Sequence, residues 1–127
     1  MKIYNRTDIR PEIKGINDVK NKTIEEAFQN QTLRPIIKMQ HNLLVAYFGA
    51  YIVSSKSKFD VMSNLKKNEF IRNVFKKDNT FKAELKGIII GQFTLDEYQT
   101  YCRHKSDFNK RILTMVEQRI TSVLKEF

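Results

Sequence analysis

An apolar run from Leu43 to Val53 constrains the fold of this chain more than any other feature. At about 100° per residue, the apolar positions between 33 and 51 fall on one broad stripe, which predicts a single helix over 32–54. From Leu43 onward the opposite side is apolar as well, with Ala46, Ala50 and Val53. A helix that is apolar all round must be covered all round. We therefore expect 32–54 to be the central helix of a domain or to enter a subunit interface.

The chain is long enough to form a hydrophobic core of its own. It has 127 residues, 41% of them hydrophobic, and a soluble chain of this length typically buries roughly two-thirds of its unfolded surface. Four glycines and two prolines argue against an all-β protein with many tight turns. The apolar run spans 11 residues, whereas a membrane helix needs about 20. With no apolar leader and one cysteine, a cytoplasmic protein without membrane association is expected.

Capping signals divide the rest of the chain into further helices. Thr23 and Thr94 each precede a Glu by three residues in capping boxes, and Thr32 and Asp78 are expected N-caps. The expected helices are 23–30, 32–54, 63–77 (with Leu65, Phe70, Ile71, Val74 and Phe75 inward), 78–91, 94–105 and a last one capped by Ser106 or Asp107. A strand over 87–93 is the alternative for its segment, but it would have no partner. An N-terminal arm or lead-in over 1–22 precedes the helical domain, 23–127.

The predicted fold class is therefore all-α. We expect a single compact domain, an irregular bundle of about five to six helices with a central apolar helix.

Residues that carry catalytic or metal chemistry are few. Cys102 and His104 form the nearest pair, but residues two apart on a helix point in different directions, and a catalytic zinc site needs about three protein ligands. Cys102 would meet His41 only through tertiary folding, and its shared face with Tyr98 favours a buried, inert thiol. There is no phosphate loop and no dinucleotide glycine fingerprint. We expect no catalytic residue, no metal and no cofactor.

One helix face gathers groups that suit an anion. Arg34, Lys38 and His41 lie at i, i+4 and i+7, so three nitrogenous side chains share a face that can bind a phosphate, a carboxylate or an acidic partner. The alternative is a solvated face whose stems cover apolar neighbours. Gln40 falls near the centre of the apolar stripe of this helix, where a buried amide needs hydrogen-bond partners within the monomer or from a symmetry mate.

The charge balance is basic, with 23 Lys and Arg against 14 Asp and Glu, a net charge of +9. Outside the arm, the excess gathers in one predicted basic patch comprising Lys56, Lys58, Lys66, Lys67, Lys76 and Lys77. A helical protein of this charge can bind nucleic acid by neutralising phosphates. However, lysine-rich surfaces often serve solubility, and no helix-turn-helix signature is present.

Three strings carry a resemblance to a known family: Phe28–Gln40, Leu85–Thr94 and Asn109–Arg111. They resemble a family of short bacterial proteins that are sometimes called glyoxalases, and the resemblance covers most of the chain after the arm. It implies no particular activity and no catalytic residues. Glyoxalase I itself is similar to paired βαβββ modules whose strands hold a metal ion, and this sequence predicts no such strands.

The leading functional prediction is a non-enzymatic cytoplasmic module that associates with itself or with a protein partner through the apolar helix. The second is a nucleic-acid-binding accessory protein. The third is a helical domain that binds a small anion through Arg34, Lys38 or His41.

Overall fold

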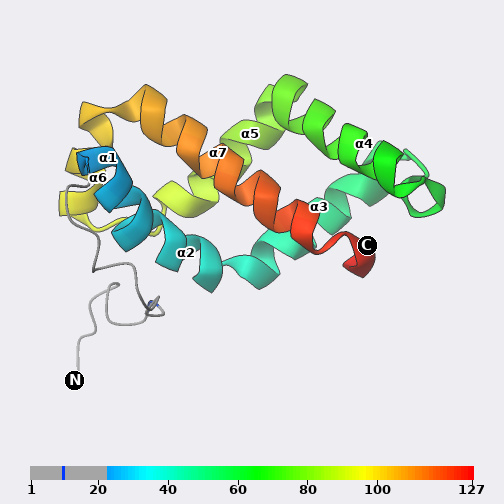
Figure 1. Cartoon of the computed structure of the whole chain (residues 1–127), viewed down its shortest axis with the longest axis horizontal. Coiled ribbons are helices and arrows are strands. Elements are labelled where there is room, and N and C mark those ends of the chain that lie inside the picture. The colour runs from blue at the N-terminus through cyan, green and yellow to red at the C-terminus, as the bar shows by residue number, and fades with distance from the viewer. Residues whose placement is uncertain (1–9, 11–22) are drawn as a thin grey trace.

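The computed structural model describes Arg10 and residues 23–127, and every regular element in this part of the chain is helical (Figure 1). The α-helices are α1 (Ile24–Phe28), α2 (Arg34–Met39), α3 (His41–Ser55), α4 (Asn64–Lys77), α5 (Asn79–Ile90), α6 (Leu95–Arg103) and α7 (Lys105–Ser122). A π-helical turn, Gln29–Leu33, joins α1 to α2, and 3-10 turns lie at Phe59–Val61 and Leu124–Glu126. The predicted all-α class is confirmed. The expected arm, 1–22, lies outside the described residues except for Arg10.

Four helices begin at short polar side chains that cap them, three of which, Thr23, Asp78 and Thr94, are predicted caps. Thr23, Ser63, Asp78 and Thr94 each accept a hydrogen bond from the backbone N–H three residues further on. At Thr94 the capping box is complete, because Glu97 Oε1 also accepts from the Thr94 N–H at 2.8 Å. Each cap satisfies an amide that has no partner within its own helix, which fixes where the helix starts.

The stretch Ile24–Met39 is one continuous helical rod, so the expectation of a break before Thr32 is wrong. Its middle turn is π-helical, and the Arg34 N–H donates to the Gln29 carbonyl five residues earlier. Pro35 explains this turn, because proline has no N–H to donate and its ring collides with the carbonyl four residues before it in an α-helix. A wider turn relieves both problems. Thr32 is consequently a buried interior residue and not an N-cap.

The helix expected over 32–54 is divided at Gln40, whose φ of −89° and ψ of 10° interrupt the helical path between α2 and α3. No proline or glycine marks this position, so the hydrophobic periodicity runs straight through it. The bend lets both α2 and α3 lie against α7 (Figure 1). A straight rod would diverge from α7 after a few turns.

The helix that joins the others is α7, which crosses the molecule and packs against α2, α3, α4, α5 and α6 (Figure 1). Its inner stripe is fully buried and comprises Phe108, Ile112, Val116 and Ile120. In contrast, α3, expected at the centre of the domain, is covered on one side, where Leu44 and Phe48 are buried.

Two groups of aromatic rings fill the ends of the core. From the middle of α3, Phe48 meets Phe59, Phe81 and Phe127 edge-on, at centroid distances of 6.0, 6.2 and 5.1 Å. At the α1–α6 end, the second group comprises Phe28, Phe93 and Phe108. Edge-to-face rings stabilise a core beyond the area that they bury.

Two smaller expectations are wrong. Leu65 is 70% exposed, because at about 100° per residue it lies about 120° away from Ile71 around α4. Lys67 takes the inner position, half-buried with its Nζ 5.2 Å from the Phe59 ring centre. The last helix begins at Lys105, and the residue before it, His104, makes no side-chain cap. The expected helix over 78–91 is confirmed and its alternative, a strand over 87–93, is wrong, since α5 runs through Ile90.

Arg10 is tied to the start of α6 by its guanidinium. It donates to both Glu97 carboxylate oxygens, at 2.5 and 2.7 Å, and to the Gln92 carbonyl at 2.6 Å. The Thr32 hydroxyl donates to Glu97 Oε2 at 3.1 Å. Burial acts to raise the pKa of Glu97, but hydrogen bonds from Arg10, the Thr94 amide and Thr32 hold it below its usual value. One carboxylate therefore links Arg10, the π-helical turn and α6.

Candidate functional site

Two of the four predicted binding residues line a groove between α2 and α7. Arg34 and Lys38 enter it from α2, one turn apart. His41, the first residue of α3, reaches it indirectly, because its ring contacts Arg119, which lines the groove from α7. Gln40 is half-buried at the bend and is not among the lining residues. The structure thus places Arg34 and Lys38 along the groove that Arg119 lines, with His41 against Arg119, and leaves Gln40 out of the lining.

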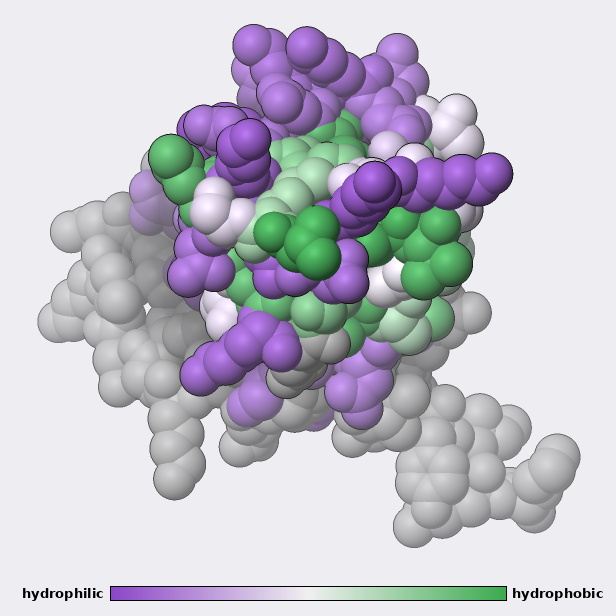
Figure 2. Space-filling model, turned by 90° about the vertical axis from the view of Figure 1, so that its right-hand side faces the viewer, coloured by the Kyte–Doolittle hydropathy of each residue, from purple (hydrophilic) through white to green (hydrophobic). Residues whose placement is uncertain are grey.

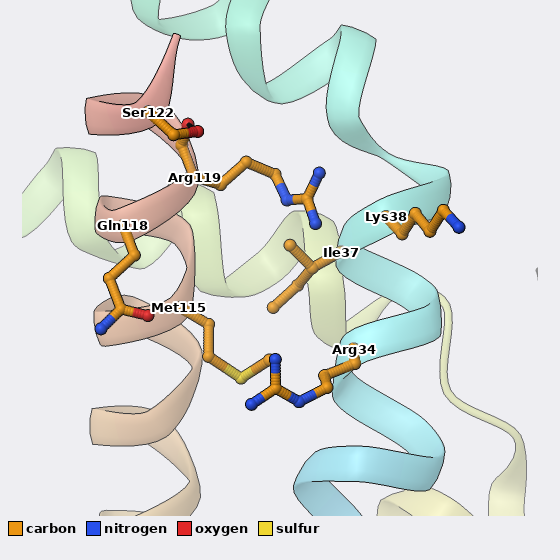
Figure 3. A pocket seen from close by; sticks show the side chains of 7 residues that line it. All are labelled: Arg34, Ile37, Lys38, Met115, Gln118, Arg119 and Ser122. Carbon is orange, nitrogen blue, oxygen red and sulfur yellow. Dashed lines mark hydrogen bonds between the residues drawn. The ribbon is translucent and has the colours of Figure 1, made fainter. Parts of the chain in front are cut away.

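The groove has a volume of about 450 Å³ and a mixed lining of Arg34, Ile37, Lys38, Met115, Gln118, Arg119 and Ser122. In Figure 3 the Arg34 and Arg119 side chains each extend from their own helix toward the opposite one. Ile37 and Met115 lie between the two helices and give the groove an apolar floor (Figure 3). Lys38 stands at the rim with its ammonium turned away from α7 (Figure 3).

Neutral side chains hold both groove arginines in place. Arg34 Nε donates to Asn30 Oδ1 at 2.8 Å, and Arg119 Nη1 lies 3.2 Å from His41 Nδ1. A guanidinium can only donate, so His41 Nδ1 is the acceptor in this hydrogen bond. Neither acceptor is negatively charged. Both arginines therefore keep a full positive charge that no ion pair with a described residue compensates.

Two other arginines are held differently. Arg10 pairs with Glu97, and Arg111 Nε donates to Asp107 Oδ2 at 3.1 Å, one turn before it on α7. In both cases a carboxylate neutralises the guanidinium. The groove arginines lack such a carboxylate, which distinguishes them from these two.

A second groove adjoins the first across Gln118 and Ser122, with a volume of about 370 Å³ between α4 and α7. Arg72 lines it from α4 and Glu117 from α7. Burial raises the pKa of Glu117, and the charge of Arg72 offsets part of that rise. This neighbouring groove contains both signs of charge, so it lacks the uniformly positive character of the α2–α7 groove.

The outer side of α3 is an exposed surface without charge. None of its 15 residues is Asp, Glu, Lys or Arg, although 29% of the whole chain is charged. Leu43 and Val53 are 49% and 78% exposed, and Ala46 and Ala50 between them are exposed as well. These four residues lie within about 80° of one another around the helix axis, and we call them the α3 face.

Two tyrosines that flank the α3 face attach α3 to α5 and to its N-cap residue. Tyr47 Oη donates to Glu84 Oε2 at 2.8 Å, and Tyr51 Oη donates to Asp78 Oδ2 at 2.7 Å. Burial, followed by the hydrogen bond to Asp78, raises the pKa of Tyr51 to about 12, and burial together with Glu84 raises the pKa of Tyr47 as well. These contacts set the rotation of α3 about its own axis, so the α3 face points outward.

The six lysines of the predicted basic patch fall into three pairs. Lys56 and Lys58 lie in the loop after α3, Lys66 and Lys67 in the first turn and a half of α4, and Lys76 and Lys77 in its last turn. Ten residues of helix separate the last two pairs, a distance of about 15 Å along the axis. Lys56 and Lys58, in the loop, have positive φ angles of 54° and 58°, which residues other than glycine adopt infrequently.

The end of the molecule where α3 stops and α4 begins combines apolar and charged side chains. Figure 2 shows apolar atoms gathered in the middle of this end, with hydrophilic side chains around them. The exposed apolar residues near this end include Val53, Val61 and Leu65, which are 78%, 77% and 70% exposed. Val53 belongs to the α3 face, so exposed apolar surface continues from that face toward the start of α4.

Cys102 is exposed, so the expectation of a buried thiol is wrong. The reason is that α6 packs inward through Tyr101, which leaves Tyr98 and Cys102 on its outer side. A hydrogen bond with Cys102 raises the pKa of Tyr98, which agrees with the predicted shared face. His104 Nε2 lies 3.6 Å from Glu25 Oε1. Within the described ranges, no three His, Cys, Asp or Glu side chains are grouped to hold a metal ion.

Arg119 is the charged groove residue that the sequence alone does not single out. It flanks the buried stripe of α7 next to Ile120, just as Arg34 flanks the stripe of α2. A basic residue beside an apolar stripe on each of two helices is a usable signal. It becomes specific only when it is known that those two helices are neighbours.

Comparison with known proteins finds no relative: no family model, no curated protein and no solved structure matches the chain. The resemblance to the bacterial family called glyoxalases stays an expectation. Among the helices that are described, none combines the length and the apolar character needed to cross a bilayer.

Proposed function

We propose that this chain is a non-enzymatic cytoplasmic interaction module that associates with a second copy of itself through the α3 face. The observation that carries the proposal is an exposed helix surface without charge on a protein with a net charge of +9. Copies of equal charge repel one another, so they approach most easily where neither presents a lysine or an arginine. The α3 face meets that condition and is apolar.

The spacing of the α3 face supports a two-fold arrangement. In an antiparallel pair centred on position 48, Leu43 lies opposite the partner's Val53, and Ala46 lies opposite the partner's Ala50. Both pairs share the same centre, so one patch complements itself, as a two-fold interface requires. The alanines at the centre permit the close helix approach of about 8 Å that small side chains allow.

The dimensions of the face predict a weak dimer. A helix of 15 residues is about 22 Å long and about 10 Å wide, far smaller than the ~800 Å² that each partner contributes to a standard interface. We therefore expect a dissociation constant of roughly tens to hundreds of micromolar, and dimers that form as the concentration rises.

Size-exclusion chromatography with light scattering over about 10 μM to about 1 mM tests the proposal. The mass of the wild-type protein should rise from 15.1 kDa toward twice that value. Ala50→Arg places a charge at the centre of the α3 face and should keep the protein monomeric. Ala83→Arg makes the same substitution at an exposed alanine of α5 and should dimerise like the wild type.

A wild-type mass of one chain at the highest concentration contradicts the proposal, as does equal loss of dimer in both variants. A further variant tests the antiparallel register. A46E/A50R places opposite charges across the two-fold axis in the antiparallel arrangement and should recover part of the dimer. In a parallel arrangement each new side chain meets its own copy, and the double variant stays monomeric.

A further inference from the structure

We propose that the groove between α2 and α7 binds a small molecule that carries a phosphate group, with Arg34 and Arg119 as the anion-binding residues. The site lies apart from the α3 face and does not depend on self-association. Three features support this site: the way the two arginines are held, their placement on opposite walls, and the apolar floor between them.

The two guanidiniums are positioned in advance and carry uncompensated charge. Asn30 fixes Arg34, and His41 fixes Arg119, each through one nitrogen of the guanidinium. The remaining N–H groups of both arginines make no hydrogen bond with a described residue. Arg111, in contrast, is neutralised by the Asp107 carboxylate. Here neutral acceptors orient the cations and leave their charge for a ligand.

Placement on opposite walls favours phosphate over a simple carboxylate. Arg34 extends from α2 and Arg119 from α7, each toward the other helix (Figure 3). The oxygens of a phosphate point in several directions, so one phosphate can accept from both walls at once. The two oxygens of a carboxylate lie in one plane and match a single guanidinium fork. Lys38, at the rim, adds a third positive charge.

The rest of the groove fits the body of a small molecule. Ile37 and Met115 form an apolar floor, and the volume of about 450 Å³ lies within the range of ligand sites, roughly 300–1,000 Å³. A nucleic-acid strand is the less favoured ligand, because a strand needs cations that continue along its backbone. The lysines of the predicted basic patch do not line this groove.

Isothermal titration calorimetry with inorganic pyrophosphate, at constant ionic strength set with sodium chloride, tests the proposal. The wild-type protein should bind one pyrophosphate saturably. R34Q/R119Q should weaken binding by at least about tenfold, and R34Q alone should weaken it measurably. Arg34 is exposed, so R34Q folds even if the double variant does not. R34K keeps the charge but loses the planar fork, and its affinity should fall between those of the wild type and R34Q.

The matched control is K66Q/K76Q, which removes the same two charges from exposed positions on α4 that do not line the groove. This control should bind pyrophosphate with an affinity within about twofold of that of the wild type. In the wild-type protein, the Met115 methyl resonance should shift as pyrophosphate is added. Three results would overturn the proposal. They are no saturable binding up to about 10 mM, equal weakening in K66Q/K76Q and R34Q, and single-stranded RNA binding through these arginines where pyrophosphate does not bind.

Discussion

Replacing Glu97 by Gln tests whether the ion pair with Arg10 stabilises the fold. Gln also serves at the third position of a capping box, so the variant keeps an acceptor for the Thr94 amide. It removes the negative charge that Arg10 pairs with and places a neutral amide against the guanidinium. The substitution therefore isolates the charge from the cap.

The expected loss is large because the pair is nearly dry. The Arg10 and Glu97 side chains are 6% and 15% exposed. Removing one partner of a buried pair costs about 3–5 kcal/mol, and we take about 3 because the Gln92 carbonyl still accepts from Arg10. With an unfolding entropy of about 2.1 cal/mol/K per residue over 127 residues, that loss lowers Tm by about 11 °C.

Thermal unfolding followed by circular dichroism measures this shift, and Glu26→Gln is the matched control. Glu26 holds the third position after the cap of α1 and is exposed, without an ion pair to a described residue. E26Q should move Tm by no more than about 2 °C. If E97Q and E26Q have equal effects, the reasoning about the buried pair is refuted.

The pH dependence gives a second check. The folded protein lowers the pKa of Glu97, so this stabilisation is present above the unfolded pKa of about 4.3 and is lost as pH falls through the folded pKa. The difference in Tm between the wild type and E97Q should therefore shrink below about pH 4. A difference that stays constant down to about pH 2 contradicts this origin.

Three further predictions concern the buried ring of Phe48, the hydroxyl group of Tyr51 and the thiol of Cys102. Phe48→Ala removes a fully buried ring and should cost about 3–5 kcal/mol in urea unfolding; a loss under about 1 contradicts the packing. Asp78→Asn should lower the pKa of Tyr51 from about 12 toward its ordinary value, seen in ultraviolet titration; an unchanged pKa means that burial alone sets it. Cys102 should react with a thiol reagent in the folded state, and a requirement for denaturant contradicts its exposure.

Local rules predict those parts of this fold that depend on neighbouring residues. The caps at Ser63, Asp78 and Thr94 follow from short polar side chains whose partners lie three residues away. The inner stripe of α7 follows from helical periodicity alone. The bend at Gln40 has no such signal, because it arises from the need of α2 and α3 to meet the same third helix.

The candidate site is likewise predictable from the sequence only where it depends on neighbouring residues. Arg34 and Lys38 share a face because they are four residues apart on one helix, which the sequence is enough to show. Arg119 joins them across a helix pair that no spacing in the sequence announces. Leu65 was expected inward because it is apolar, whereas its angle around α4 already placed it off the inner face.

The π-helical turn before Pro35 has a consequence for every residue on either side of it. One extra residue in a helical turn rotates the two halves of the rod by about 100° relative to a regular helix. If Gln29–Leu33 were wound as a regular α-helix with the same number of residues, the rod would still form hydrogen bonds but its two halves would be out of phase. Phe28 would then leave the rings of Phe93 and Phe108, or Arg34 would leave the groove. The winding of this segment therefore couples the aromatic core at one end of the molecule to the charged groove beside it.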